Sequence, residues 1–363
     1  MHIHDLPTPA LIVDRKRLKN NLESMAEVAA AAKVKLRPHI KTHKSPFIAH
    51  WQQELGACGV TVATIDEAEI MVYNGIKDIF MAYPMAEVHR AERLARLSRL
   101  AKVSVGVDSK AGVSILAEAV SKYDAHLGVL IEIDTGLNRS GLASSENVAE
   151  LARTISKAPG LELRGVFTHA GHAHGADAEG RTRIGQAEGE ITVEIAQSLR
   201  KAGFPIQEVS TGSTPSAATV AQVPGVTEIR PGTYVFNDGS LVAIGLANWQ
   251  QCALTVLATV VSKPGSNRCI LDCGSKSLAS DKQKGVPGFG TIKGQETTSI
   301  SWLNEEHGVI EGDSPHQGIG EKVEIIPNHA CTVMNLFDEY YLVEDGIVLA
   351  RIPVAARGHR HLI

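Results

Sequence analysis

The chain has 363 residues, of which 44% are hydrophobic, 21% are charged and 15 are histidines. This composition excludes a disordered chain, a collagen-like repeat and a small disulfide-rich scaffold. With a formal net charge of −4, the chain lacks the excess of basic residues that is typical of nucleic-acid-binding proteins. The five cysteines are sparse, and neither a signal peptide nor a membrane-length apolar run is present, which predicts a cytoplasmic protein without a membrane partner.

The first predicted elements are a strand over 9–14 and a helix over 15–32. From residue 34 onward, short apolar runs alternate with amphipathic helical patterns, for example at 86–99 and 180–202. Eight strand–helix units in series predict an α/β fold with a TIM-like (β/α)8 barrel over 15–240, and an open doubly wound sheet is the alternative. The predicted barrel strands are 34–40, 59–64, 78–84, 102–108, 126–134, 161–169, 207–212 and 227–231.

The pattern changes after about residue 240, where strand-like runs are separated by turn residues. These runs lie at 251–262, 268–273, 322–326 and 339–354. They predict a second, mainly antiparallel β domain, formed by residues 1–14 together with 241–363. The glycine-rich segment 284–294 does not have GxGxxG spacing, and we expect it to be a mobile loop.

Polar residues collect where the predicted barrel strands end. Because active sites of such barrels lie at the C-terminal ends of the strands, we expect these side chains to share one rim. In chain order they are Lys41, Arg139, His169, His172, His174, Thr211, Gly212, Ser213 and Tyr234.

Each of these residues has an ordinary and a functional interpretation. Lys41 is either a solvated lysine or a partly desolvated amine that forms a Schiff base. The turn at 211–213 is either a helix N-cap or a phosphate site made of backbone N–H groups and hydroxyls. Arg139 can also simply pair with Asp134.

A second candidate site is the pair His329 and Cys331. If the segment is a strand, residues i and i+2 point to the same side and converge on one ion. An imidazole and a thiolate suit zinc, although other divalent ions are possible, and two protein ligands leave positions open for substrate. His359 and His361 have the same spacing, but their place near the chain end predicts no function.

These motifs, in this order, resemble the metal-dependent, alanine-racemase-like pyridoxal phosphate enzymes of fold type III. The similarity is greatest to the D-threonine aldolase and D-serine dehydratase family. It spans nearly the whole chain and rests on segments 5–10, 37–44, 169–172, 211–213, 230–232, 305–308 and 327–331.

The resemblance implies that Lys41 carries pyridoxal 5'-phosphate, that Arg139 lies near its phenolic oxygen, and that His172 is a candidate base. It implies a phosphate cradle formed by Thr211, Gly212, Ser213 and Tyr234. It also implies that His329 and Cys331 bind a divalent metal, zinc or manganese, and that the protein is a homodimer.

The implied activity is that of a lyase acting on D-3-hydroxy amino acids, cleaving them to glycine and an aldehyde. Aldolase members often carry aspartate where Cys331 stands, and dehydratases carry cysteine, whereas His172 favours the aldolase. D-serine dehydratase activity, giving a keto acid and ammonia, is therefore the alternative. An amino-acid racemase, a non-catalytic cofactor-binding protein, and a zinc hydrolase are less favoured. The hydrolase would use His39, His43, His169 and His172 as ligands.

Overall fold

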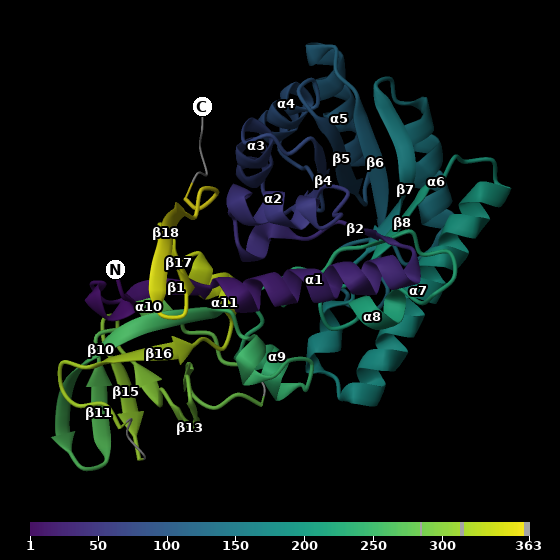
Figure 1. Ribbon diagram of the computed structural model, residues 1–363. Helices are drawn as coiled ribbons and strands as arrows, with labels where there is room; N and C mark the ends of the chain where they lie inside the picture. The colour runs from purple at the N-terminus through teal and green to yellow at the C-terminus, as the bar shows by residue number, and fades with distance from the viewer. Residues whose placement is uncertain (284, 313–315, 359–363) are drawn as a thin grey trace. The chain divides into compact units, whose positions relative to one another are not determined.

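The protein is described by a computed structural model that covers residues 1–283, 285–312 and 316–358 (Figure 1). It divides into two compact units. Unit 1 contains Met1–Ser24, Thr42–Ser45 and Thr233–Arg357, and unit 2 contains Met25–Lys41 and Pro46–Gly232, with Gly358. His359 and His361 lie outside the described residues. Among the helices of the described segments, none has the length and apolar character needed to cross a membrane.

Unit 2 is built on an eight-stranded parallel sheet in the order β2-β9-β8-β7-β6-β5-β4-β3. A parallel bridge between His39 and Thr61 joins the two ends of this order and closes the barrel. The strands are β2 (Lys35–Leu36), β3 (Val60–Val62), β4 (Asp78–Met81), β5 (Lys102–Val107), β6 (Leu127–Ile133), β7 (Leu161–Thr168), β8 (Glu208–Thr211) and β9 (Glu228–Ile229). The predicted barrel and its eight strand positions are confirmed, and the open-sheet alternative is wrong.

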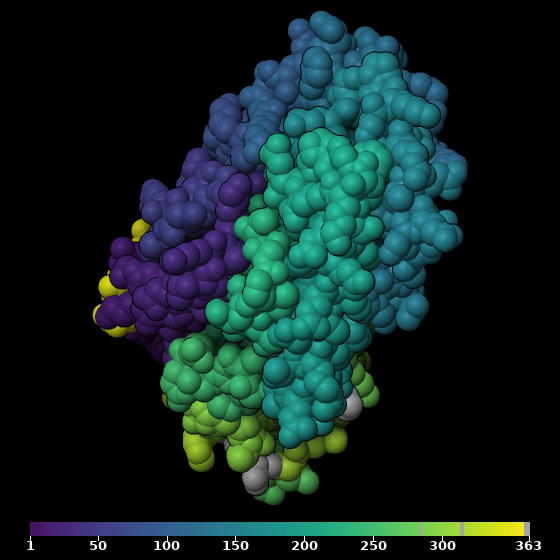
Figure 2. Space-filling model, turned by 90° about the vertical axis from the view of Figure 1, so that its right-hand side faces the viewer, coloured from purple at the N-terminus to yellow at the C-terminus, as the bar shows by residue number. Residues whose placement is uncertain are grey.

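Helices connect successive strands and cover the outside of the barrel, as Figure 1 shows for α3 to α6. In Figure 2, the teal atoms of α6 to α8 and their loops form the surface on the side facing the viewer. Local sequence fixes where such helices begin: at α3, Thr64 and Glu67 form a capping box. The helices are α1 (Arg15–Ala32), α2 (Pro46–Glu54), α3 (Ile65–Tyr73), α4 (Val88–Leu97), α5 (Lys110–Tyr123), α6 (Ser145–Lys157), α7 (Ala178–Lys201) and α8 (Ala217–Val220).

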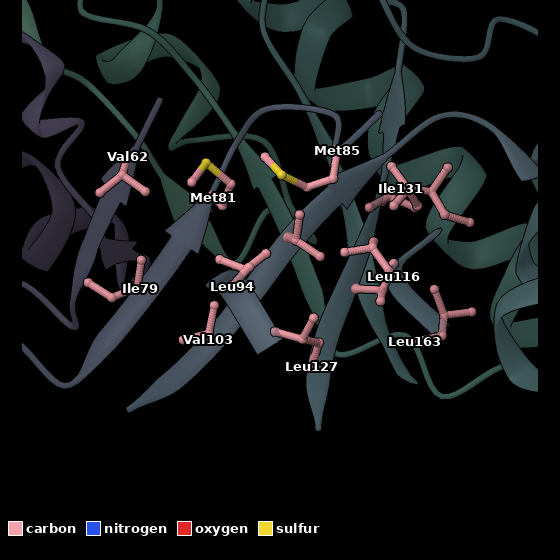
Figure 3. Close-up of a cluster of buried hydrophobic side chains, with 14 of the residues drawn as sticks. Val62, Ile79, Met81, Met85, Leu94, Val103, Leu116, Leu127, Ile131 and Leu163 are labelled. Carbon is pink, nitrogen blue, oxygen red and sulfur yellow. The ribbon is translucent and has the colours of Figure 1, made fainter. Parts of the chain in front are cut away.

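Successive side chains along a barrel strand point to opposite faces of the sheet, so the strands contribute to two separate hydrophobic clusters. On β4, Ile79 and Met81 face outward into the large cluster between strands and helices, which Figure 3 shows with Leu94 and Leu116. Phe80, between them, belongs instead to a small cluster with Leu130 and Phe167. This second cluster comes from the opposite faces of the strands and therefore fills the barrel interior.

Glycine at position 106 makes room for this interior cluster. A Cβ placed on Gly106 would lie 2.5 Å from Cζ of Phe167, closer than carbon atoms approach one another. The Phe167 ring packs edge-on against Phe80, with 5.0 Å between the ring centroids. A side chain at residue 106 would therefore displace the aromatic pair that fills this part of the barrel.

Unit 1 is built on a ten-stranded, mainly antiparallel sheet, which confirms the predicted second architecture. β1 lies between two of its strands, antiparallel to β10 and parallel to β17. The predicted run 339–354 is a hairpin of two strands. The strands are β1 (Ala10–Asp14), β10 (Leu254–Gly265), β11 (Arg268–Leu271), β12 (Thr291–Ile292), β13 (Gln295–Ser299), β14 (Trp302–Leu303), β15 (Gly308–Glu311), β16 (Lys322–Ile326), β17 (Glu339–Glu344) and β18 (Ile347–Pro353).

Two sequence expectations for unit 1 need correction. Residues 291 and 292, expected within a loop, form β12 and pair with β16. The short strands β12 to β15 were not predicted. Runs of two to five residues are too short to display the alternation that identifies a strand. Short helices α9 (Gly239–Ala243), α10 (Ser275–Leu278) and α11 (Ala330–Met334) complete the unit.

Candidate active site

Lys41 lies in a 3-10 turn, Ile40–Thr42, that follows β2, and its side chain is exposed. Its backbone N–H donates to Nδ1 of His39 at 3.5 Å. His39 in turn bridges to Thr61 where the barrel closes. The candidate lysine is thus anchored through its backbone at the carboxyl end of the first barrel strand.

His169 follows β7 and is partly buried. Burial holds the pKa of His169 well below its usual value, and the nearby positive charges of Lys41 and Arg139 lower it further. Arg230 and His174 act in the same direction. The imidazole is therefore neutral at neutral pH. Its electrostatic coupling to the two predicted cofactor residues places all three at the same end of the barrel.

His172 lies in the 3-10 turn Gly171–Gly175. Its Nδ1 atom is buried and has no hydrogen-bond partner among the described residues. The ring packs against Gly136, where an added Cβ would lie 3.8 Å from Nε2. A buried ring nitrogen without a protein partner is a polar atom whose hydrogen bond a ligand can supply.

The sequence predicted that the backbone N–H groups of the loop Thr211-Gly212-Ser213 are free to bind phosphate. In the structure, two of them already have partners within the chain. Gly212, at φ +87°, donates its N–H to Oε1 of Glu188 at 2.8 Å, and Ser213 donates to Oγ of Ser216 at 3.1 Å. α8 begins only at Ala217. The hydroxyl of Thr211, however, is buried without a partner in the described chain. The Thr211 hydroxyl is therefore available to form a hydrogen bond with a ligand.

Arg139 is exposed, and its Nη2 lies 3.8 Å from Oε1 of Glu132. It does not pair with Asp134, whose carboxylate instead accepts the backbone N–H groups of Gly136 and Asn138 at 2.9 and 3.1 Å. Burial raises the pKa of Glu132 above its usual value. The guanidinium of Arg139 is therefore only loosely held and can turn toward a ligand.

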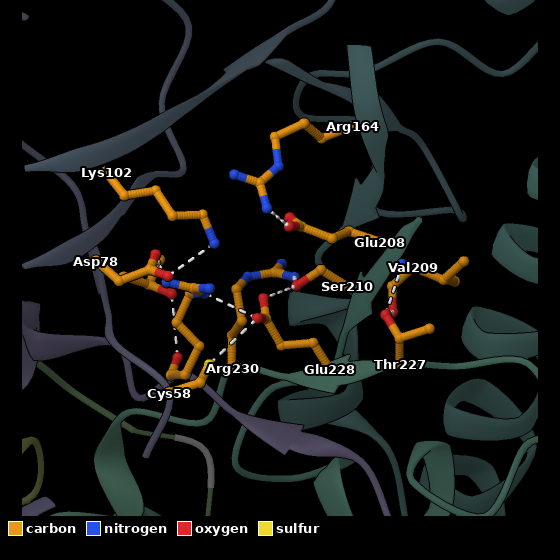
Figure 4. Close-up of polar contacts among 12 residues, drawn as sticks. Cys58, Asp78, Lys102, Arg164, Glu208, Val209, Ser210, Thr227, Glu228 and Arg230 are labelled. Carbon is orange, nitrogen blue, oxygen red and sulfur yellow. Dashed lines mark hydrogen bonds and ion pairs between the residues drawn. The ribbon is translucent and has the colours of Figure 1, made fainter. Parts of the chain in front are cut away.

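Arg230 is a buried polar residue to which the sequence assigned no role (Figure 4). It donates to Oγ of Ser210 at 2.6 Å and to the carbonyl of Thr168 at 2.5 Å. Its guanidinium also lies over the rings of Phe80 and Phe167, at 5.6 and 5.3 Å from their centroids. Burial lowers the pKa of Arg230 to about 10. The residue joins the ends of β7, β8 and β9 inside the barrel.

A second arginine extends this network. Glu228 accepts hydrogen bonds from Ser210 at 2.6 Å and from Nε of Arg37 at 2.8 Å. Arg37 also pairs with Asp78, at 2.6 Å. Figure 4 labels Asp78, Ser210 and Glu228 of this network. The one sequence signal for this cluster was the presence of charged residues within or next to strands predicted to be buried.

His329 and Cys331 lie in unit 1, but not in a strand. β16 ends at Ile326, His329 is the N-cap of α11, and Cys331 lies in its first turn. The predicted i, i+2 strand geometry is therefore wrong. The two side chains nevertheless lie close enough for each to shift the pKa of the other. Imidazole and thiol therefore meet through a helix start rather than through strand alternation.

Three further contacts define the surroundings of this pair. Nδ1 of His329 lies 2.9 Å from Oδ2 of Asp281, and the thiol of Cys331 donates to Oγ1 of Thr42 at 3.3 Å. Asp238 accepts the backbone N–H of Ala330, which lies between the two predicted ligands, at 2.9 Å. Both predicted ligands are thus oriented by neighbouring polar groups.

These contacts set the charge state of the pair. Burial favours the neutral thiol, but the hydrogen bond and charge of His329 outweigh it and lower the pKa of Cys331. Burial opposes the charged imidazole, yet Cys331 and Asp281 raise the pKa of His329 to about 9. The imidazole of His329 therefore favours loss of the thiol proton of Cys331.

Two further predictions concern Tyr234 and the zinc site of the hydrolase alternative. Tyr234 is buried in the 3-10 turn Thr233–Val235 of unit 1. Across the described residues, no group of three or more His, Cys, Asp or Glu side chains is arranged to hold a metal ion. The four-histidine zinc site of the hydrolase alternative therefore has no support.

Known proteins were compared with the chain over its whole length. The family described as the N-terminal domain of alanine racemase matches residues 13–239, and a putative serine dehydratase domain matches residues 253–343. A D-threonine aldolase from an Arthrobacter species is 33% identical over 359 residues, covering 97% of this chain and 93% of that protein. A D-threo-3-hydroxyaspartate dehydratase from Delftia sp. HT23 is 35% identical over 365 residues, covering 94% and 96%.

Solved structures give the same result. The crystal structure of D-threonine aldolase from Filomicrobium marinum superposes with a TM-score of 0.93 at 30% identity, covering 99% of this chain and 98% of that one. The resemblance inferred from the sequence motifs is thereby confirmed. The chain belongs to the alanine racemase-like, fold-type III family of pyridoxal phosphate enzymes, in the group that contains D-threonine aldolases and D-serine dehydratases.

Proposed function

We propose that this protein is a pyridoxal phosphate- and divalent metal-dependent lyase that acts on D-3-hydroxy amino acids. The proposed reaction is cleavage of the D-threonine aldolase type, giving glycine and an aldehyde. The alternative is dehydration of D-serine or a related D-3-hydroxy amino acid to a keto acid and ammonia. The observation that carries the proposal is the carboxylate-oriented imidazole of His329, two residues from Cys331 at the start of α11, because a racemase requires no metal. Relatives named for both lyase reactions support it.

The barrel residues fit the proposed cofactor. The buried hydroxyl of Thr211, which lacks a partner among the described residues, suits a phosphate oxygen. The exposed amine of Lys41 would hold the cofactor covalently, and Arg139 would contact its phenolic oxygen. The proposed phosphate contacts are Thr211, Gly212, Ser213 and Tyr234.

The residues of unit 1 fit a divalent ion. Because Nδ1 of His329 is occupied by Asp281, Nε2 is the nitrogen available to a metal. The lowered pKa of the Cys331 thiol favours the thiolate that a metal requires. A nitrogen and a sulfur donor suit zinc, with manganese as the second choice from the family resemblance.

When bound, the cofactor stabilises negative charge at the substrate Cα, and the metal polarises the 3-hydroxyl group. In the aldolase reaction, His172 would take the hydroxyl proton while the Cα–Cβ bond breaks and the aldehyde leaves, and a proton returned to Cα would complete glycine. In the dehydratase reaction, Lys41 takes the Cα proton, water leaves, and hydrolysis gives the keto acid and ammonia. The unpartnered Nδ1 of His172, within the described chain, favours the aldolase reaction.

Product identification tests the proposal. Purified protein with pyridoxal phosphate and zinc or manganese is incubated with D-threonine, D-serine or D-threo-3-hydroxyaspartate, with and without EDTA. We expect glycine and acetaldehyde from D-threonine, lost with EDTA and restored by metal. A keto acid and ammonia select the dehydratase. Formation of the L-isomer that persists in EDTA indicates a racemase, and absence of all these products contradicts the proposed lyase.

We also propose that the cofactor is bound by a barrel domain, residues 15–240, and the metal by a β domain, residues 1–14 with 241–363. The family resemblance supports a homodimer, which light scattering of the purified protein would test. All five cysteines are free thiols in the structure, which supports a reducing, cytoplasmic location. Fractionation of cells that express the protein would test the location.

A further inference from the structure

We infer that Glu188 is a positioning residue that fixes two cofactor-site loops of the barrel at once. The inference rests on the proposed function, because those loops are the ones proposed to surround pyridoxal phosphate. Glu188 lies on α7, far from either loop in sequence, and none of its atoms is proposed to touch substrate or cofactor. Its role follows from three hydrogen bonds that meet at one carboxylate.

The two oxygens of Glu188 have separate partners. Oε1 accepts the backbone N–H of Gly212 at 2.8 Å and that of Ala170 at 3.4 Å. Oε2 accepts the hydroxyl of Ser216 at 2.8 Å, and the same hydroxyl accepts the N–H of Ser213. One side chain therefore reaches the loop after β7 and, directly and through a serine, the loop after β8.

Close packing of α7 against the segment after β8 brings the Glu188 carboxylate within hydrogen-bonding distance of the loop. Gly185 and Gly189 lie on either side of Glu188 in the helix. A Cβ on Gly189 would lie 2.7 Å from Cγ2 of Val223, and one on Gly185 would lie 3.1 Å from Cβ of Thr219. Glycine at both positions lets the helix approach the segment after β8 closely enough for a glutamate to span the gap.

Burial makes these bonds necessary. Glu188 is 1% exposed, and Gly212 and Ala170 are also enclosed. Without Glu188, both backbone N–H groups would be buried without an acceptor in the described contacts, which strongly disfavours the native loop conformations. The loops would have to move to recover hydrogen bonds from water or from each other.

Such movement acts on the proposed cofactor contacts. Gly212 lies between Thr211 and Ser213, and Ala170 lies between His169 and the turn that carries His172. Displacement of the loop after β8 moves the Thr211 hydroxyl, which has no partner among the described residues, away from the position of a phosphate. Glu188 therefore controls phosphate recognition through loop position rather than through contact.

The test compares Glu188→Ala, Glu188→Gln and Glu190→Ala in the full-length protein. Gln keeps an acceptor for the N–H groups and gives Ser216 a donor, so it should retain loop position without the charge. Glu190 lies two residues along the same helix, is exposed and accepts a hydrogen bond from Gln186, which makes it the matched control. Each apoprotein is titrated with pyridoxal phosphate and with pyridoxal, which lacks the phosphate.

We expect Glu188→Ala to weaken pyridoxal phosphate binding by about tenfold or more, the size set by unsatisfied buried hydrogen-bonding groups. Pyridoxal binding should change much less, so the preference for the phosphorylated ligand falls. Glu188→Gln should restore that preference, and Glu190→Ala should leave it unchanged. General destabilisation would instead weaken both ligands equally, which would overturn the inference, as would wild-type affinity in a folded Glu188→Ala protein.

Hydrogen exchange separates this inference from the proposed function. Faster exchange at the amides of Gly212 and Ala170 in Glu188→Ala supports the positioning role even if the wild-type protein binds no pyridoxal phosphate, an outcome that would contradict the proposed function alone. If Glu188→Ala does not fold, Ser216→Ala provides the second variant. It removes the bond to Oε2 and should lower the phosphate preference, and an unchanged preference would count against the inference.

Discussion

Nδ1 of His329 lies 2.9 Å from Oδ2 of Asp281, a residue 48 positions earlier in the chain. A carboxylate only accepts hydrogen bonds, so this contact keeps an N–H on Nδ1 and makes Nε2 the nitrogen that would give up its proton to bind an ion. Imidazoles that bind metals are commonly oriented in this way by a carboxylate. Asp281 thus has the geometry of a residue that prepares His329 for an ion.

Replacing Asp281 should therefore weaken metal binding without removing a ligand. We expect Asp281→Ala to raise the dissociation constant for zinc by about 10–100-fold, because the imidazole loses both orientation and basicity. Asp281→Asn should have a smaller effect, because the amide oxygen still accepts the N–H. Competition with a chromophoric chelator measures the constant directly.

Glu306→Gln is a suitable control for the Asp281 variants, because Glu306 is an exposed carboxylate of the same unit that pairs with Lys276. It should bind zinc as the wild type does. If Asp281→Ala also binds zinc with wild-type affinity while His329→Ala does not, Asp281 has no role in orienting the ligand.

Cys331→Asp should change metal preference. A thiolate favours zinc, whereas a carboxylate favours harder ions such as manganese and magnesium. We expect zinc affinity to fall by roughly tenfold or more while manganese affinity stays constant or rises. Parallel titrations of the metal-free protein with both ions measure the ratio, with Cys269→Ala, a buried cysteine on β11, as the control. An unchanged ratio argues against Cys331 as a ligand.

Lys41→Ala should abolish covalent cofactor binding. The amine of Lys41 is the only group that we assign to Schiff-base formation, so its loss should remove the yellow absorbance and the label fixed by borohydride. Lys44→Ala, three residues along the same segment, should keep both signals. Mass spectrometry of the reduced, digested protein identifies the modified lysine. A label on any lysine other than Lys41 would show that our assignment is wrong.

The barrel was predictable because its strands are continuous, largely β-branched runs whose order alone implies the architecture. Residues at strand ends, such as Lys41 and His169, followed from the rule that active sites lie there. The pair His329 and Cys331 was found by its spacing, although the helix start at α11 replaces the predicted strand. The two side chains therefore lie close together even though the local secondary structure was predicted wrongly.

The supporting residues could not be predicted in the same way. Glu188 and Gly212 are separated by 24 positions, and Asp281 and His329 by 48. Nothing in the local pattern distinguishes Glu188 from the exposed Glu190 beside it, and Asp281 lies outside any helix or strand. Their partners are determined by how the helix and loop pack, which depends on the folded chain as a whole.

Glu188 also gives a stability prediction. Burial raises the pKa of Glu188 above its usual value, although hydrogen bonds from Gly212 and Ser216 and the charge of Arg230 oppose the shift. A carboxyl whose pKa is raised by folding favours the folded state most when it is protonated, below the ordinary value of 4.5, and this contribution is lost as pH rises through the folded pKa.

Glu188→Gln, which is always neutral, should therefore gain stability relative to wild type as the pH rises from acid to neutral. Thermal unfolding of the two apoproteins between pH 4.5 and 8, a range chosen around the ordinary carboxyl pKa, measures the difference. The Tm of the Glu190→Ala control should show the same pH dependence as that of the wild type. A Tm difference that is independent of pH would mean that Glu188 is not a titrating buried acid in this range.

Arg37 and Glu228 form a buried pair, with side chains 5% and 2% exposed and 2.8 Å between Nε and Oε2. Arg37→Met leaves both Glu228 and Asp78 without their guanidinium partner, so it should lower the free energy of unfolding by about 3–5 kcal/mol. Adding Glu228→Gln to Arg37→Met should recover part of the loss, because the uncompensated charge at residue 228 is removed. Urea unfolding measures each value.

The exposed pair of Arg90 and Glu87 provides the comparison for this network, since both side chains are more than half exposed. Arg90→Met should cost less than about 1 kcal/mol, because water screens the pair. The contrast between the two arginines isolates burial as the cause. Equal losses in Arg37→Met and Arg90→Met, or a double variant less stable than Arg37→Met alone, would show that charge compensation inside the barrel does not govern its stability.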